Sequence, residues 1–159
     1  MASKNGKKKY SLGSVVALPL PDGRFAFARI YQDYNYGVYD FLSQKIVPVE
    51  EVLKRKVSFF QSATDAAVKS GKWVVIGEAP FANKDDAWPP PRAAGVLPGD
   101  ELGPLSPLLS YNGNMRNAAL DEVMGLDKDE FCQRPELFID VVVDRLINGN
   151  HDAYRVPDC

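Results

Sequence analysis

Cysteine and histidine are scarce in this sequence, and their scarcity excludes several kinds of site. The chain of 159 residues contains two cysteines, Cys132 and Cys159, and a single histidine, His151. Two cysteines are too few for a disulfide framework, so we expect a reduced, cytoplasmic setting. These distant residues cannot complete a tetrahedral metal site, and we expect no metal ion or other cofactor.

Long apolar runs and common catalytic motifs are missing too. No window approaches the roughly 20 apolar residues of a membrane span, so we expect no contact with a membrane. There is no Gly-rich phosphate loop and no Gly-x-Ser-x-Gly elbow. Cys132 and His151 could form a nucleophile and base pair, but the sequence supplies no third group to orient them. We therefore expect neither residue to be catalytic and the protein not to be an enzyme.

Charge is distributed unevenly along the chain. The net charge is −2, yet residues 1–75 carry 12 basic and 6 acidic side chains, whereas residues 121–159 carry 4 and 10. Several of the basic residues lie in residues 1–10, which we expect to be a flexible basic leader. The acidic C-terminal part is therefore the stronger indication of a charged surface.

Turn and strand patterns predict a small, curled, mostly antiparallel and barrel-like sheet over about residues 13–80. The clearest element is a hairpin, in which apolar runs at residues 15–20 and 24–31 flank the turn residues Pro21-Asp22-Gly23. Because side chains alternate across a strand, the aromatic residues of the second run share one face and its alanines share the other.

The remaining elements complete the prediction of an α+β fold. We expect strands at residues 36–41, 45–49, 56–60 and 72–77, the last of them the most deeply buried, and a short helix near residues 65–70. A Pro- and Gly-rich loop or linker occupies about residues 82–113, and a helical segment occupies about residues 116–150, with its longest helix at 135–147. Residues 11–159 would form a single domain.

Tyrosines after the hairpin are candidates for binding a partner. Most aromatic residues in this region must fill the core, and we expect Phe25 and Phe27 to be buried. The segment "YQDYNYG" places Tyr31, Tyr34 and Tyr36 on or beside a loop. Tyr34 and Tyr36 are the better surface candidates, because exposed phenol rings are useful in binding.

A second candidate surface lies on the last predicted helix. Glu136, Asp140 and Asp144 are spaced four residues apart and therefore form one stripe on that helix. The stripe is either the solvated face opposite an apolar row or a recognition surface for a basic partner.

A small barrel that binds nucleic acid is the alternative function. Such modules use exposed aromatic rings and a positive groove. The cluster of Lys54, Arg55 and Lys56 favours this alternative, whereas a net charge of −2 and a pI near 5.4 count against it.

The order of these motifs resembles the immunity protein 26 family of bacterial polymorphic toxin systems. The resemblance covers roughly residues 10–90: a Gly-initiated hairpin, an aromatic strand that bears Asp, and a later Trp-x-x-Ile-Gly-x-x-Pro segment that begins at Trp73 and ends at Pro80. It implies a non-catalytic protein that binds a cognate toxin domain and blocks its active surface. It does not extend to the acidic stripe, and the oligomeric state stays open.

Overall fold

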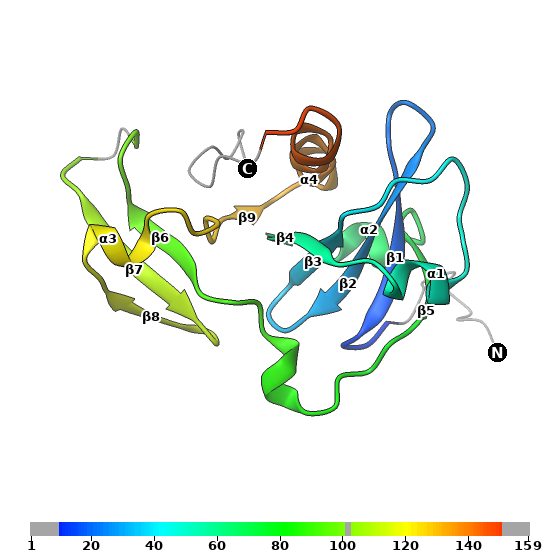
Figure 1. Cartoon of the computed structure of the whole chain (residues 1–159), viewed down its shortest axis with the longest axis horizontal. Helices are drawn as coiled ribbons and strands as arrows, with labels where there is room; N and C mark the ends of the chain where they lie inside the picture. The colour runs from blue at the N-terminus through cyan, green and yellow to red at the C-terminus, as the bar shows by residue number, and fades with distance from the viewer. Residues whose placement is uncertain (1–9, 101–102, 151–159) are drawn as a thin grey trace.

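The computed structural model describes residues 10–100 and 103–150, which form two sheets (Figure 1). The strands of the first sheet, in spatial order, are β5 (Val74–Glu78), β1 (Ser14–Pro19), β2 (Phe25–Tyr31), β3 (Asn35–Tyr39), β4 (Val57–Ala63) and β9 (Phe131–Cys132). Neighbouring strands are antiparallel, except that β9 runs parallel to β4. The predicted α+β class is confirmed, and the sheet is open because β5 and β9 form its two edges.

The β1–β2 hairpin is the one that the sequence predicts. The two strands pair from Val15 to Pro19 of β1, and Gly23 in the connecting turn has a φ of 90°. The Asp22 carboxylate accepts a hydrogen bond of 3.0 Å from the backbone N–H of Arg24, which stabilises the turn. Phe27 is fully buried, as expected, and Phe25 is half-buried.

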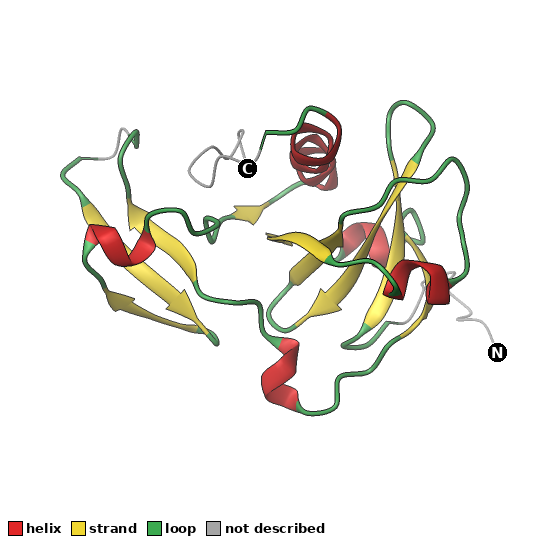
Figure 2. Ribbon diagram, viewed as in Figure 1, coloured by secondary structure: helices red, strands yellow, loops and turns green. Residues whose placement is uncertain are grey.

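Both faces of the first sheet are covered (Figure 2). The face that carries the alanines of β2 packs against the helices α2 (Ala66–Lys69) and α4 (Pro135–Val142). The opposite face, which carries the phenylalanines of β2, packs against α1 (Val49–Leu53). A strand that is buried on both faces needs apolar side chains at successive positions, and the "SVVAL" run of β1 meets this requirement.

Residues 45–49 do not form the predicted strand and instead lead into α1. Pro48 has no N–H to give to a strand ladder, and its φ of −59° suits the position directly before a helix. Val47 and Val49 still pack in the core on the α1 side of the sheet. The apolar pattern therefore predicts the partial burial of Val47 and Val49 but not the 42% exposure of Ile46, and it predicts the secondary structure incorrectly.

The strand expected to be most deeply buried, β5, is an edge strand. It pairs with β1 alone, and Val74 is 38% exposed. The deeply buried residue of this segment is instead Trp73, directly before β5, with 1% of its surface exposed. An apolar run of this length does not distinguish a central strand from an edge strand.

The Pro- and Gly-rich stretch is more ordered than the sequence predicts, because it contains most of the second sheet. The strands of this sheet are β6 (Arg92–Val96), β7 (Ser106–Tyr111) and β8 (Asn114–Asn117), and α3 (Leu120–Val123) packs beside β7. Asn112 and Gly113, with φ values of 51° and 82°, form the two-residue turn between β7 and β8.

The chain leaves the first sheet after β5 and returns to it at β9. The outward connection contains the short 3-10 helix η1 (Lys84–Ala87), and the return leads into α4, which continues as the π-helical turn η2 (Val143–Ile147) (Figure 1). The helix predicted at residues 135–147 is thus confirmed. None of the helices in the described residues is long and apolar enough to span a bilayer.

Candidate partner-binding site

A strained turn presents the most promising side chain of the first sheet. Asp33 and Tyr34 are the central residues of the turn between β2 and β3, each with a φ of 59°, and the N–H of Asn35 donates to the Gln32 carbonyl at 3.3 Å. Positive φ at both central positions is the geometry of a type I′ turn, which normally favours Asn and Gly. A left-handed tyrosine costs on the order of 1 kcal/mol. The turn therefore holds Tyr34 in an unfavourable backbone conformation at the surface.

Tyr34 is paired with a second exposed aromatic ring. Half of the Tyr34 surface is exposed, and its ring lies edge-on to Phe131, with 6.3 Å between the ring centroids. Phe131 is 39% exposed and belongs to β9, which is distant in sequence. Sequence reasoning did not select Phe131, because the parallel pairing of β9 with β4 has no local signal.

Tyr36, expected at the surface, is buried instead. It is 2% exposed, its hydroxyl donates to the Thr64 carbonyl at 3.1 Å, and its ring contacts those of Trp73 and Phe138. The alternation along β3 turns Tyr36 toward α4. Burial raises the pKa of the Tyr36 hydroxyl.

Tyr31 is also largely buried, on the opposite face. Its ring packs against Phe60 and Phe81, each with 4.9 Å between centroids, and burial raises the pKa of its hydroxyl. Tyr31, Tyr34 and Tyr36 nevertheless line one hollow of about 190 Å³. The structure thus brings the three predicted tyrosines together: Tyr34 is exposed, and Tyr31 and Tyr36 are buried beside it.

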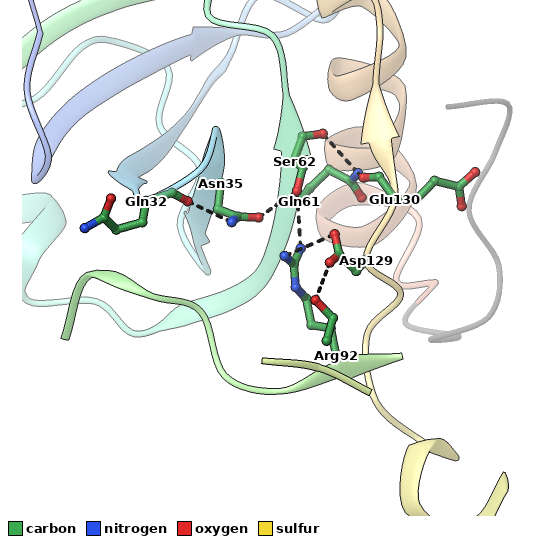
Figure 3. A network of polar contacts seen from close by, with 8 residues as sticks. Gln32, Asn35, Gln61, Ser62, Arg92, Asp129 and Glu130 are labelled. Carbon is green, nitrogen blue, oxygen red and sulfur yellow. Dashed lines mark hydrogen bonds and ion pairs between the residues drawn. The ribbon is translucent and has the colours of Figure 1, made fainter. Parts of the chain in front are cut away.

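A buried polar network joins the two sheets beside this turn (Figure 3). Arg92 of β6 forms an ion pair with Asp129 at 3.2 Å and donates to the Ser62 hydroxyl at 3.5 Å. Ser62 donates to the Asn35 side-chain oxygen at 2.6 Å, and the Asn35 amide donates to the Gln32 carbonyl at 2.8 Å. The chain of contacts therefore runs from the second sheet to the base of the strained turn.

Arg92 is the charged centre of the network. Its side chain is 5% exposed. Burial lowers the pKa of its guanidinium, while Asp129, Asp127 and Asp33 act in the opposite direction. Ser110 of β7 donates a hydrogen bond to the Asp129 carboxylate, so both partners of the ion pair are held in place. This arrangement is typical of a structural contact between packed elements.

The tips of two hairpins face each other across a hollow of about 60 Å³ above this network. Asp33 and Asn35 line it from the first sheet, Asn112 and Gly113 line it from the second, and Trp88 lies between them. A Cβ atom on Gly113 would come within 3.0 Å of the Trp88 ring, so glycine permits this close packing. We call this space the hairpin-tip hollow. Its Asn-Gly turn was a strong hairpin signal that sequence reasoning did not use.

The acidic stripe lies elsewhere. Glu136 and Asp140 are exposed, Asp144 is half-buried, and the apolar side of α4 packs into the core. Glu136 and Asp140 line a different hollow, of about 300 Å³, together with Trp73. The structure therefore does not bring the acidic stripe together with the tyrosines.

The other residues considered from the sequence that the structure describes line none of these hollows. Cys132 is fully buried, and His151 lies outside the described residues. Lys54 pairs with Glu51 at 3.4 Å, and the Arg55 guanidinium lies 4.2 Å from the centre of the Phe41 ring. Within residues 10–100 and 103–150, no group of three His, Cys, Asp or Glu side chains is placed to hold a metal ion.

An exposed aromatic pair formed by a turn and an edge strand of a well-packed sheet, such as Tyr34 and Phe131, is the kind of surface that protein-binding modules use. Comparison with protein families narrows this class. The model of the family described as immunity protein 26 matches residues 11–93 of the 159, and the chain belongs to this family. The family implies a toxin-neutralising role and is generally non-catalytic. No curated protein and no solved structure matches the chain.

Proposed function

We propose that this protein neutralises a cognate toxin by binding it in a fixed stoichiometry and occluding its active surface. Membership of the immunity protein 26 family is the observation that carries the proposal. The proposal includes a toxin from a bacterial polymorphic toxin system, as the family resemblance implies, and a cytoplasmic encounter, as the low cysteine count predicts.

The strained turn supports Tyr34 as an anchor of the interface. A tyrosine with a φ of 59° destabilises the fold, and backbone strain at a surface position is a common mark of function. Tyrosine is also one of the residues that most often dominate binding energy. Tyr31 and Tyr36 would act indirectly, because their buried rings hold in place the two strands that carry the turn. Their part in binding stays a prediction.

The acidic stripe on α4 is a second part of the proposal. Glu136, Asp140 and Asp144 would attract a basic toxin during approach, which raises the association rate more than the final affinity. The exposed positions of Glu136 and Asp140 are compatible with this role.

Titration with the toxin encoded beside this gene tests the mechanism. We expect a stable complex of fixed stoichiometry and loss of toxin activity only when the protein is present in at least that ratio. Protection at substoichiometric amounts would instead indicate enzymatic inactivation of the toxin. No binding at micromolar concentration would contradict the proposal and favour the nucleic-acid alternative.

Tyr34→Gly separates binding from stability. Glycine adopts the positive φ without strain, so we expect the free energy of unfolding to change by less than about 1 kcal/mol. Loss of an aromatic anchor should weaken toxin binding by about 2 kcal/mol or more. Calorimetric titration measures the affinity, and chemical denaturation measures the stability. The matched control is Leu53→Ala on the α1 side, which removes another exposed apolar side chain and should leave toxin binding unchanged.

A further inference from the structure

The second sheet carries an unusually exposed set of apolar side chains. In and beside it, Leu105, Tyr111, Met115 and Met124 are each more than half exposed, whereas among the described residues of and around the first sheet no large apolar side chain exceeds the 50% of Tyr34. Tyrosine and methionine are enriched in protein interfaces, and methionine adapts to differently shaped partners. The second sheet therefore offers a surface suited to a protein partner.

The hairpin-tip hollow lies beside a mainly apolar groove on this sheet, which Arg116 also lines. Pro91, Leu109 and Tyr111 line the groove, which has a volume of about 670 Å³. Asn112 and Met115 line both the groove and the hollow, so the two spaces are adjacent. One partner segment could therefore occupy both.

The charged residues that line the hollow, Asp33, Arg92 and Asp129, carry one excess negative charge. Arg92 forms its ion pair with Asp129 and acts on Asp33 only from a greater distance, since none of the ion pairs in the described residues includes Asp33. Asp33 is exposed and lines the hollow, where a positive group could approach it. The charge and the geometry therefore suit a cationic group from a binding partner.

The other groups in the hollow favour a guanidinium over an ammonium ion. Asn112 and Trp88 line it, and the Trp88 ring lies beside Gly113, whereas the Asn35 amide is already bonded to Ser62 and Gln32. A planar guanidinium can stack on an aromatic ring while it donates to a carboxylate and to amide oxygens. The volume of about 60 Å³ corresponds to room for roughly four water molecules, which suits one side-chain head group.

We propose that the hairpin-tip hollow receives the guanidinium of an arginine on the toxin, and that the neighbouring toxin segment lies in the apolar groove. This inference rests on the proposed function and adds a specific partner chemistry to it. Both hairpins contribute to the site, although the second lies outside the residues that match the family.

A small probe tests the hollow without the toxin. In amide NMR spectra of the full chain, Nα-acetyl-L-arginine amide should shift the resonances of Asp33, Asn112 and Gly113. The neutral isostere Nα-acetyl-L-citrulline amide should not shift them. Absence of these shifts, or equal shifts with the citrulline probe, would overturn the proposal.

Asp33→Asn is the matched variant. Asparagine tolerates positive φ as well as aspartate does, so the turn should keep its shape. We expect this variant to bind the arginine probe at least about tenfold more weakly, while Asp40→Asn, which neutralises an exposed carboxylate elsewhere, should have no effect. Unchanged probe binding by the Asp33→Asn protein would contradict the proposal.

The toxin complex gives an independent result. Asp33→Asn should weaken toxin binding about tenfold or more, and Tyr111→Ala should weaken it without changing the response to the arginine probe. A toxin that binds the wild type and both variants equally well would overturn the inference while leaving the proposed function intact. An arginine probe that binds as expected beside a toxin that does not bind would instead contradict the proposed function.

Discussion

The two sheets differ sharply in how much core they possess. The first sheet has apolar clusters on both faces, one of them including Trp73, Phe59 and Phe138. The cluster of the second sheet contains only three buried residues, Ala93, Leu97 and Val123, and all four residues of β8 are exposed. Such a small core contributes little stability of its own. The comparison teaches that the second sheet depends on its attachment to the first.

The largest expected effect comes from the core of the first sheet. Phe27→Ala removes a fully buried ring and should lower the free energy of unfolding by about 3 to 5 kcal/mol. Leu97→Ala in the second sheet should cost less, about 2 to 3 kcal/mol, because its small cluster can relax around the cavity. Urea denaturation measures both values. A cost below about 1 kcal/mol for Phe27→Ala would contradict its deep burial.

Breaking the attachment should have the next largest effect. Arg92→Met leaves Asp129 without its cation in a partly buried site, at a cost of about 2 to 4 kcal/mol. We also expect the second sheet to open before the first, so that fluorescence and amide exchange report separate transitions. The control Arg116→Met breaks the exposed pair with Glu122 and should cost less than about 1 kcal/mol. Coincident transitions in the Arg92→Met protein would show that the sheets are coupled by other contacts.

Charge reversal on α4 should give a smaller and kinetic effect. We expect Glu136→Lys combined with Asp140→Lys to slow association with a basic toxin several-fold at low salt, with little change in dissociation. Stopped-flow kinetics at two salt concentrations measures both rates. Equal association rates for the wild type and the reversed protein would restrict the binding surface to the hairpin tips.

The smallest expected effect is a difference in acid sensitivity. The Asp100 carboxylate accepts a hydrogen bond from the Leu97 N–H at 2.7 Å and pairs with Lys128, and these contacts hold its pKa below the ordinary value of 3.8. The unfolded chain therefore binds a proton at higher pH than the folded chain does, and this stability is lost as the pH falls below about 4. Asp100→Asn should flatten the pH dependence of unfolding between about pH 5 and pH 3. An unchanged pH profile would contradict the assignment.

Local patterns predicted the first sheet well. The hairpin at residues 15–31 follows from its turn residues and from side-chain alternation, both of which act over a few positions. The sequence also identified Tyr34 as an exposed aromatic. Each of these results depends on neighbours in the chain.

Long-range contacts explain what the sequence did not predict. Tyr36 is buried because α4, about 100 residues later in the chain, packs over its face of β3. Phe131 joins Tyr34 only through the pairing of β9 with β4. The Arg92–Asp129 pair likewise joins segments that no local pattern connects. The Asn112-Gly113 turn is different, because its hairpin signal is present in the sequence, within a stretch whose Pro and Gly content predicts a loop.

The return of the chain to β9 also has a consequence for the time course of folding. Gln61 and Glu130, which are hydrogen-bonded beside this pairing, are 69 positions apart. Closing so long a loop is slow compared with forming the β1–β2 and β2–β3 hairpins, so we expect β9 and α4 to dock late. Val38→Ala in β3 should then slow refolding, whereas Val142→Ala in α4 should mainly speed unfolding. During synthesis, the β4 edge of the first sheet would therefore stay unpaired until β9 docks. Under the proposed function, a nascent chain would bind its toxin only after α4 had left the ribosome as far as residue 142 and had packed on the sheet.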